Sequence, residues 1–378
     1  MAWDQDLQHA LETALKQEET PASLAVQSLI QRALELSASD IHLDPQQERL
    51  LIRFRMDGVL HDVAFLPKSW QNRLIGKIKV FSNLLTYRED LAQEGRISDF
   101  SCPIRVSIFP TLYGEKTTLR IFQPTKLDLD LETLGFDPKT LSKIQAIIFR
   151  PQGMFLLTGP SGSGKSTTIY TILQTLNQHF ERTRSIITIE DPIEVPLEGI
   201  VQTQLNRNIG LDFQGSLRTI LRHDPDMIMI GEIRDRETAE IAIEAGLTGH
   251  FIISTIHSGR AIGVFGRLLE MEIEPYLLTS ALTAVLAQRL IRLLCPECER
   301  NEKKSCPSCH GIRYKGRAIL YEFVPVEGPI RTAILQREDM DIFKEAMKAL
   351  NCETLMDCAQ RALFQNKTRT EEITRVLG

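Results

Sequence analysis

Two different spacings of apolar residues divide the chain. Apolar residues recur every three or four positions over 7–15, and a second helix is expected from Thr20 as N-cap with Pro21 at its first helical position. The pattern then changes to short apolar runs, "DIHLDP", "RLLIRFRM" and "VLHDVAFL", separated by turn residues, which predicts hairpins. With a further helix over about 68–84 and strands in "RVSIFP" and "TTLRIF", the pattern predicts an α+β domain over residues 1–122.

The pattern changes again beyond residue 122. Residues 123–138, "QPTKLDLDLETLGFDP", show no clear period and carry prolines near both ends, as an interdomain linker does. Over 139–285, short all-apolar strands alternate with helical segments, which predicts an α/β domain with a parallel sheet covered on both faces. Residues 286–378 form a separate C-terminal region that begins with a cysteine cluster and continues as a mostly helical tail from about Pro329.

Composition excludes some classes of protein. The chain has 378 residues, with 44 Lys and Arg against 49 Asp and Glu, and a net charge of −5, so no basic excess points to nucleic acid. The N-terminus lacks the basic and apolar regions of a signal peptide, and no apolar run is long enough to span a membrane. We therefore expect a cytoplasmic protein, at most peripheral to a membrane.

A phosphate-binding loop is the most specific motif. "GPSGSGKST" matches G-x-x-x-x-G-K-[ST], follows an apolar strand and precedes an amphipathic helix. Its glycines let backbone N–H groups surround phosphates, its lysine reaches the β and γ phosphates, and Ser166 is a ligand for Mg²⁺. The alternative is a flexible Gly/Ser loop that matches by chance. The motif predicts a RecA-like P-loop ATPase domain that binds ATP through Gly159, Pro160, Ser161, Gly162, Ser163, Gly164, Lys165, Ser166 and Thr167.

Acidic residues end two further strands. "IITIEDPIE" closes with Glu190 and Asp191, which at the carboxyl end of a strand can hold Mg²⁺ through water or polarise the attacking water. The alternative is that they cap the turn before Pro192. In "HDPDMIMIGEIRD", Glu232 ends the strand and is expected to orient the hydrolytic water, although Gly231 stands where many P-loop ATPases have an aspartate.

Other polar residues near these strands are lesser candidates. Asp224 and Asp226 precede the strand and would lie at its far end, whereas Asp235 is close enough to remain a minor candidate. Of the two histidines in "LTGHFIISTIH", His257 ends its strand and is expected to sense the γ-phosphate. A lone histidine such as His250 is more often structural.

Four cysteines form two C-x-x-C pairs separated by seven residues, "CPEC" and "CPSC". Four thiolates at this spacing fit a tetrahedral structural zinc site, which would stabilise a small lobe. A nucleic-acid-binding zinc ribbon is the alternative, but "ERNEKKS" between the pairs is only mildly basic and has no aromatic residues for stacking. The predicted zinc ligands are Cys295, Cys298, Cys306 and Cys309, and Cys102, Cys352 and Cys358 are expected to be ordinary thiols.

Long motifs in a fixed order resemble those of the secretion ATPases of type II secretion and type IV pilus assembly. They are "SASDIHLDP", "RFRMDGVL", "RVSIFPTLYGEKTTLRIF", the P-loop, "IEDPIE", "LRHDPDMIMIGEIRD", "LTGHFIISTIH" and "AQRLIRLLCPEC". The resemblance implies a homohexamer on the cytoplasmic face of the inner membrane. ATP turnover there would drive pilus or pseudopilus assembly through a membrane platform protein, with no nucleic-acid partner expected.

The resemblance also implies roles for particular residues. The family's Asp box corresponds to 187–194 and its His box to the region of His250 and His257, while the Gly-Glu of its Walker B strand matches Gly231 and Glu232. The N-terminal domain is PAS-like in the family, and its arginines that approach the nucleotide match Arg105 and Arg120; a positioned guanidinium can raise the rate about 10³ to 10⁵-fold. Weaker candidates are Arg88, Arg96 and Arg267.

Two departures from the family pattern bear on the machine that the chain serves. The insert between the cysteine pairs is shorter than usual, and only about 37 residues precede "SDIHLDP", which resembles competence ATPases or reduced secretion systems. Retraction members of the family lack the four cysteines, so their presence favours assembly. A retraction ATPase, a nucleic-acid-translocating motor and a nucleotide-gated scaffold without turnover remain the alternatives.

Overall fold

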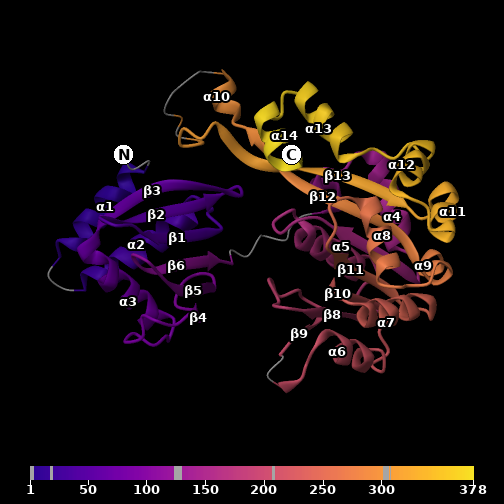
Figure 1. The fold of residues 1–378 in the computed structure, drawn as a ribbon, viewed down its shortest axis with the longest axis horizontal. Coiled ribbons are helices and arrows are strands. Elements are labelled where there is room, and N and C mark those ends of the chain that lie inside the picture. Colours follow the sequence, from indigo (N-terminus) through magenta and orange to yellow (C-terminus); the bar gives the residue numbers. More distant parts are fainter. Residues whose placement is uncertain (1–3, 18–19, 123–129, 207–208, 301–305, 307) are drawn as a thin grey trace. The chain divides into compact units, whose positions relative to one another are not determined.

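The computed structural model describes the chain except residues 1–3, 18–19, 123–129, 207–208, 301–305 and 307. The chain divides into two compact units, Met1–Thr125 and Lys126–Gly378. Figure 1 shows the elements of each unit along the sequence. Part of the expected linker, 123–129, lies outside the described residues, and the rest of it forms a short 3-10 helix, Leu131–Leu134, and the approach to the next helix.

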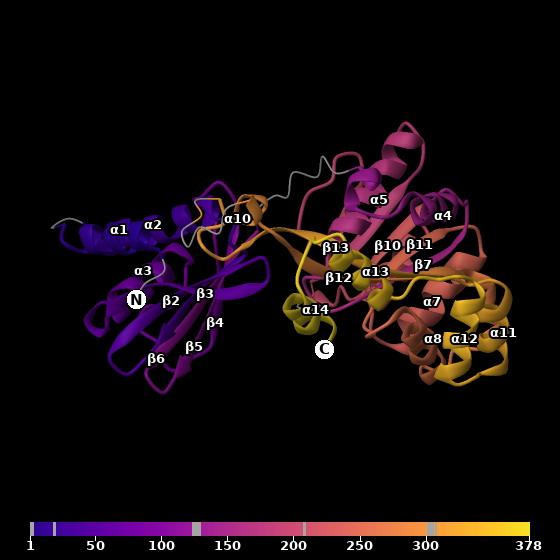
Figure 2. The same ribbon diagram turned by 90° about the horizontal axis from the view of Figure 1, so that it is seen from above.

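The first unit is an antiparallel sheet with three helices on one face (Figure 2). The strand order is β3-β2-β1-β6-β5-β4, and every pairing is antiparallel, so the predicted α+β arrangement of hairpins is confirmed. The elements are α1 (Gln5–Leu15), α2 (Pro21–Glu35), β1 (Asp40–Pro45), β2 (Arg49–Met56), β3 (Val59–Pro67), a 3-10 turn (Lys68–Trp70), α3 (Gln71–Phe81), β4 (Gln93–Ile97), β5 (Ile104–Thr111) and β6 (Gly114–Ile121).

Local polar contacts position the helices of the first unit. Alternate residues of β2 are buried, which gives the sheet one apolar face for the helices to cover. Asp4 caps α1 by accepting a hydrogen bond from the Leu7 backbone N–H at 2.9 Å. The same carboxylate accepts a second bond from Arg32 of α2 at 2.7 Å, so the two helices are joined at this end.

The second unit is a seven-stranded sheet of order β13-β12-β7-β11-β10-β8-β9. Its strands are β7 (Gly153–Thr158), β8 (Ile186–Glu190), β9 (Val201–Gln204), β10 (Met227–Ile233), β11 (Phe251–Ile256), β12 (Leu282–Leu294) and β13 (Tyr314–Pro325). Its helices are α4 (Pro138–Ile148), α5 (Lys165–His179), α6 (Phe213–Ile220), α7 (Arg236–Leu247), α8 (Ala261–Glu270), α9 (Pro275–Ala281), α10 (Pro296–Arg300), α11 (Gly328–Gln336), α12 (Met340–Ala349), α13 (Leu355–Phe364) and α14 (Thr370–Leu377).

The sheet of the second unit is buried on both faces, as its apolar strands predict. Every residue of β7 is buried, and its side chains alternate between two cores: Met154 and Leu156 pack in one, while Phe155 and Leu157 pack in the other. Helices α4, α5, α13 and α14 supply side chains to the second core, and α6 to α9 with α11 and α12 supply the first (Figure 2). The predicted parallel α/β architecture is confirmed, because six of the strands are parallel neighbours and only β13 runs antiparallel.

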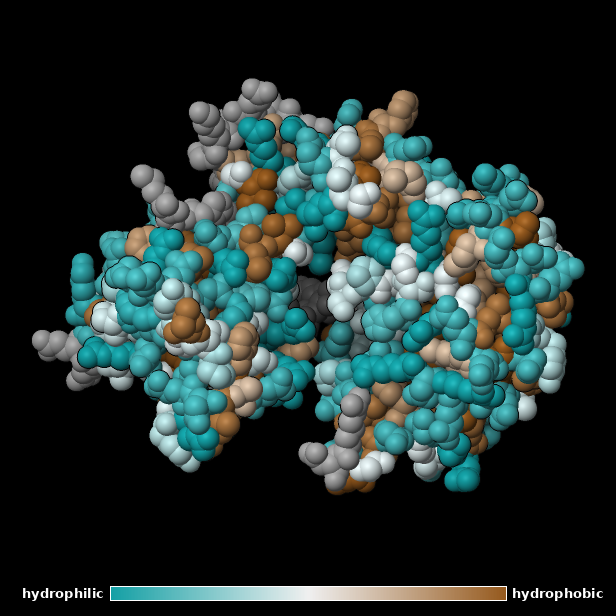
Figure 3. Space-filling view, viewed as in Figure 1, coloured by the Kyte–Doolittle hydropathy of each residue, from teal (hydrophilic) through white to brown (hydrophobic). Residues whose placement is uncertain are grey.

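Three strands of this sheet, β9, β12 and β13, were not predicted. The run "LTAVLAQRLIRLL" forms β12, which pairs with β7 in parallel and with β13 in antiparallel register, and residue 285, where we expected the ATPase domain to end, lies inside it. The mostly helical tail that follows β13 agrees with the predicted one. Figure 3 shows that the outer face in this view is mostly hydrophilic, with scattered apolar residues.

Candidate functional site

The phosphate-binding loop connects β7 to α5, at the carboxyl edge of the parallel sheet. Gly159 and Gly164 have φ angles of 145° and 91°, which side chains rarely tolerate, and a Cβ on Gly159 would lie 2.5 Å from the Gln288 carbonyl oxygen. Helix α5 begins at Lys165 without a side-chain cap, so the backbone N–H groups of its first turn face the loop. This is the arrangement that binds phosphate at a helix N-terminus.

Lys165 lies among charged groups from three other segments. Its ammonium donates hydrogen bonds to the carbonyl oxygens of Gly159 and Pro160, each at 2.9 Å. Burial lowers the pKa of Lys165, the positive charge of Arg289 lowers it further, and the carboxylates of Glu194 and Glu232 oppose the shift. The lysine thus has one cation and two carboxylates around it.

Glu232, near the end of β10, is held from two sides. His257, from the loop after β11, places its Nε2 3.3 Å from Oε2 of Glu232, and Arg234 donates a hydrogen bond to Oε1. That hydrogen bond raises the pKa of Arg234. The glutamate and histidine line a pocket of about 250 Å³ that Arg267 also borders. A Cβ on Gly231 would lie 3.1 Å from the Ile189 carbonyl oxygen, so the fold leaves little room there for the aspartate of other P-loop ATPases.

Glu190 lies elsewhere in the site, in a buried polar network. Its side chain is 3% exposed, and its carboxylate accepts hydrogen bonds from Thr188 at 2.5 Å, from Gln202 at 3.0 Å and from the Tyr170 hydroxyl. Burial, followed by the Glu190 carboxylate, raises the pKa of Tyr170. The groups that shift the pKa of Lys165 include Glu194, four residues further along, rather than Glu190. The charge of Glu194 thus opposes the lowering of the Lys165 pKa by burial, while Glu190 is surrounded by hydrogen-bond donors.

The remaining acids and histidine have structural partners. Asp235 caps α7 by accepting a bond from the Thr238 backbone N–H, and Asp226 accepts one from Ser185 before β8, at the other edge of the sheet. His250 precedes β11 and hydrogen-bonds through Nδ1 to the Ala245 carbonyl. Of the two histidines, His257 is therefore the one at the nucleotide edge.

The candidate arginines of the first unit form a row across its sheet. Strand register places Arg120 opposite Arg105, and Arg105 opposite Arg96, so the three side chains project from one face. Arg120 donates to Asp40 at 3.0 Å, and Arg105 donates to Glu94 at 2.5 Å. Both remain substantially exposed, with side-chain exposures of 65% and 48%. The row thus presents three guanidinium groups on one face of this unit, two of them paired with carboxylates.

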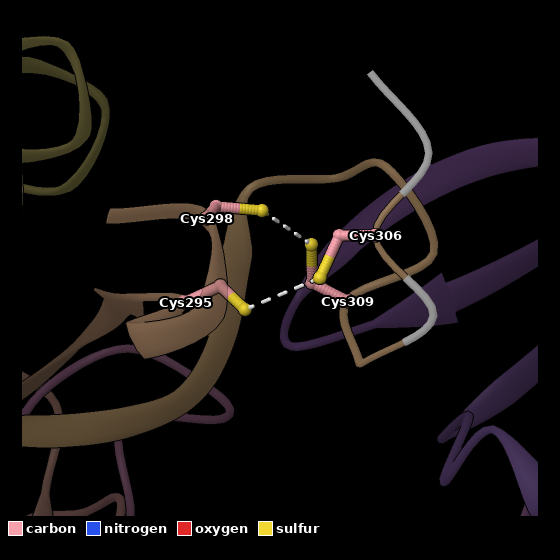
Figure 4. Close-up of side chains that lie close together, drawn as sticks. All are labelled: Cys295, Cys298, Cys306 and Cys309. Carbon is pink, nitrogen blue, oxygen red and sulfur yellow. Dashed lines mark hydrogen bonds between the residues drawn. The ribbon is translucent and has the colours of Figure 1, made fainter. Parts of the chain in front are cut away.

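The four predicted zinc ligands converge (Figure 4). Their sulfur atoms all lie within 4.8 Å of one another, with Cys295 to Cys306 at 3.9 Å and Cys298 to Cys309 at 3.3 Å. Tetrahedral zinc with Zn–S bonds of about 2.3 Å would place the sulfurs about 3.8 Å apart, so the donor set and its spacing fit zinc. The site lies at the end of the β12–β13 hairpin, where Cys295 directly follows β12.

Comparison with known proteins places this geometry in a family. The profile of the family described as "Type II/IV secretion system protein" matches residues 15–375. Type II secretion system protein E of Pseudomonas aeruginosa is 38% identical over 387 residues, covering 96% of this chain and 76% of that protein. The chain belongs to the type II/IV secretion system protein family. Another relative, the type IV pilus assembly ATPase PilB of Myxococcus xanthus, is 37% identical over 392 residues, covering 96% of this chain and 69% of that protein.

Solved structures agree with this assignment. The ATPase DotB of Legionella pneumophila matches with a TM-score of 0.71 at 22% identity, covering 93% of this chain and 94% of that one, which shows the shared fold. The pilus retraction motor PilT with bound ADP matches with a TM-score of 0.63 at 25% identity, covering 93% and 96%. The predicted family and fold class are therefore confirmed, and the chain is a secretion-family ATPase. Among the described residues, no helix is both long and apolar enough to cross a membrane.

Proposed function

We propose that this chain is a Mg²⁺-dependent ATP-hydrolysing motor that powers the assembly of a pilus or pseudopilus. Relatives at 37–38% identity that are named as type II secretion and pilus assembly proteins support a role in such a machine. The P-loop supports ATP binding and hydrolysis. The observation that carries the proposal is the P-loop at the start of α5, at the same edge of the sheet where Glu232 of β10 lies 3.3 Å from His257. Phosphate-binding and acidic groups thus meet at one edge of the sheet.

The residues divide the work of hydrolysis. Lys165 and the N–H groups of the loop bind the phosphates, and Ser166 holds Mg²⁺, which would neutralise charge on the phosphates. Glu232 orients the attacking water, and His257 holds Glu232 in place while sensing the γ-phosphate.

Two of the three acids of "IEDPIE", Glu190 and Glu194, have different parts in the proposal. We assign the carboxylate facing Lys165 and Mg²⁺ to Glu194, because its charge acts on Lys165. Glu190 positions the segment that carries it, because Tyr170 donates to Glu190 and accepts a bond from the Glu194 backbone N–H at 3.3 Å. The sequence had placed the Mg²⁺ role on Glu190, four residues earlier.

The oligomeric state and location of the chain are the last part of the proposal. The chain would form a homohexamer on the cytoplasmic face of the inner membrane, against a platform protein of the machine, and Arg105 and Arg120 would approach the phosphates of a nucleotide as charge-stabilising groups. Their exposed row in the first unit supports this part, because exposed guanidinium groups are available to an anion. The cysteine cluster would hold zinc and stabilise its lobe.

Hydrolysis by the purified chain tests the central step. Phosphate release from Mg·ATP should be measured for the wild type and for Lys165→Ala, with the oligomeric state followed by light scattering. We expect turnover that depends on Mg²⁺ and falls at least about 100-fold in the variant, since removing a phosphate-bound charge costs several kcal/mol. A wild type that binds ATP but never hydrolyses it, in any oligomeric state, would instead support a scaffold.

Mixing variants tests whether subunits share a site. Arg105→Ala and Lys165→Ala chains would each be inactive alone, and mixed rings should regain part of the activity if the arginine acts on a neighbour's nucleotide. No recovery at any ratio contradicts a shared site. Arg331→Ala, an exposed arginine of α11, is the matched control.

Retraction is the second candidate, because the PilT structure matches this chain along 93% of its length. The two functions differ in cells. Deletion of an assembly motor leaves a cell without pili, whereas deletion of a retraction motor leaves it with an excess. Pilus counts after deletion, with restoration by the wild type but not by Lys165→Ala, separate them.

A further inference from the structure

Arg289 of β12 is a second cation beside the phosphate-binding loop. The parallel register places Ala287 of β12 opposite Thr158, the last residue of β7, so Arg289 lies just beyond the end of β7, level with the loop. Its Nη1 would be 3.1 Å from a Cβ built on Gly159. The guanidinium therefore borders the first residue of the loop.

The charge of Arg289 has no acidic partner in contact. The partly buried guanidinium donates to two backbone carbonyls, of Gln288 at 2.8 Å and of Gly259 at 2.6 Å. Within the part of the chain that the structure describes, no carboxylate oxygen comes within 4.0 Å of it. Burial lowers the pKa of Arg289, and Glu322 opposes the shift from a distance, while the Glu322 carboxylate itself accepts a bond from the Ala261 backbone N–H at 2.8 Å.

Lys165 is in the same position. It too donates only to backbone carbonyls, and it is near enough to Arg289 for the two positive charges to repel. Two partly buried cations side by side are costly unless an anion compensates them. Both cations contact neutral carbonyl oxygens, and a guanidinium matches phosphate with two parallel N–H donors.

The buried hydroxyl of Ser163, which also lies near Gly159, is a separate observation that indicates a ligand. Ser163 is 3% exposed, and its Oγ has no hydrogen-bond partner. The hydroxyl would lie 2.7 Å from a Cβ on Gly159, the same atom that Arg289 approaches. Buried polar atoms nearly always have a partner, so an oxygen-bearing ligand at this loop is the expected one.

We propose that Arg289 binds the phosphates of the nucleotide in the same chain, as a second cation beside Lys165. This inference rests on the proposed function. It assigns a phosphate contact to a residue of β12, which lies outside the P-loop motif. It also means that part of the phosphate charge would be compensated within one subunit, whatever a neighbouring subunit supplies.

Binding of Mg·ATP and Mg·ADP by calorimetry tests the proposal with four variants. Arg289→Gln keeps donors for the carbonyls but loses the charge, and we expect it to weaken both nucleotides about 10- to 100-fold, the range for a hydrogen bond to a charged group. Arg289→Lys keeps the charge and should bind more tightly than Arg289→Gln. Lys165→Ala should lose most binding, and Arg331→Gln should match the wild type.

The outcomes distinguish a failure of this proposal from a failure of the proposed function on which it rests. If Lys165→Ala loses binding while Arg289→Gln binds within twofold of the wild type, Arg289 is not a phosphate ligand although the nucleotide site stands. If Lys165→Ala also binds normally, the nucleotide site itself is wrong. If Arg289 has a purely structural role, Arg289→Gln should lower the melting temperature of the protein without nucleotide, and Arg289→Lys should bind nucleotide as weakly as Arg289→Gln does. Either result would overturn the phosphate contact. We expect that melting temperature to be unchanged.

Discussion

His257 Nε2 lies 3.3 Å from the Glu232 carboxylate; Glu232 belongs to β10, and His257 directly follows β11, the neighbouring strand of the sheet. The pairing joins the last residue of the predicted histidine motif to the only acid at the end of β10. A change at the γ-phosphate that moves the histidine would therefore reach Glu232, which we propose orients the water. The relationship motivates the first prediction.

Glu232→Gln should retain ATP binding and lose turnover. An amide of the same shape keeps one oxygen that can accept a bond from Arg234, but it cannot take a proton from water, and general-base groups contribute about 10² to 10⁴-fold to rates. Single-turnover hydrolysis and calorimetry measure the two quantities separately. Glu244→Gln, an exposed glutamate of α7, is the control. Equal losses of binding and turnover would show that Glu232 only supports the fold of the site.

Glu194 and Glu190 should behave differently when each is changed to Gln. Glu194→Gln should lower turnover at least about 10-fold with little change in melting temperature, because its carboxylate acts on Lys165 from an exposed position. Glu190→Gln disturbs a buried carboxylate that accepts three hydrogen bonds, so we expect unfolding to become easier by about 2 kcal/mol. Denaturant titrations and hydrolysis assays on both variants distinguish them. The reverse pattern would return the Mg²⁺ role to Glu190.

The cysteine cluster should carry about one zinc ion per chain. Cys306→Ser removes one of four thiolates, so metal content should fall, and the melting temperature should fall with it, because structural zinc contributes folding energy. Elemental analysis and thermal melts with and without a chelator measure this. Cys352→Ser, a half-buried thiol outside the cluster, should change neither. A wild type without zinc that melts identically in chelator would refute the metal site.

A buried ion pair should make the C-terminal helix sensitive to acid. Glu372 of α14 is fully buried and accepts hydrogen bonds from Arg292 of β12 at 2.7 and 3.0 Å and from Arg375. Burial alone would raise the pKa of Glu372, but these hydrogen bonds outweigh it and hold the pKa at about 2, below its ordinary 4.5. The folded state therefore favours the carboxylate, and the stability from this pair is complete above about pH 4.5 and lost as the pH falls toward 2.

Glu372→Gln tests that pair. It leaves Arg292 buried without its charge partner, so we expect unfolding at pH 7 to become easier by about 3 kcal/mol. The difference from the wild type should shrink as the pH is lowered through the window above. Glu371→Gln, the exposed neighbour on the same helix, is the control. A difference that stays constant from pH 7 to pH 2 would show that the charge of Glu372 contributes nothing.

How far the sequence predicted the structure depends on how local each feature is. The P-loop was predictable, because its glycines, lysine and serine lie within nine residues and their spacing follows from phosphate geometry. The cluster of four cysteines was predictable for the same reason. Strand β12 was missed because "LTAVLAQRLIRLL" follows helix α9 directly and carries neither a clear helical nor a clear strand period.

Side-chain direction was harder to predict than strand position. Glu190 ends its strand as expected, and the pleat turns its carboxylate toward Tyr170 of α5 and Gln202 of β9, neighbours that the strand pattern did not indicate. Its role at Mg²⁺ stays a prediction. A strand's end places a residue at an edge of the sheet but does not decide which neighbours surround it.

By itself the sequence determined the α/β and α+β architectures, the phosphate loop, the strand ends that carry Glu232 and His257, and the two cysteine pairs, because each depends on residues close together in the chain. Only the tertiary structure decided that Glu194 lies near Lys165, that Arg289 borders Gly159 from 130 residues away, and that Glu372 is buried against Arg292. Those contacts join strands, helices and loops that are distant in sequence, and their positions are set by packing of the whole domain rather than by any local pattern.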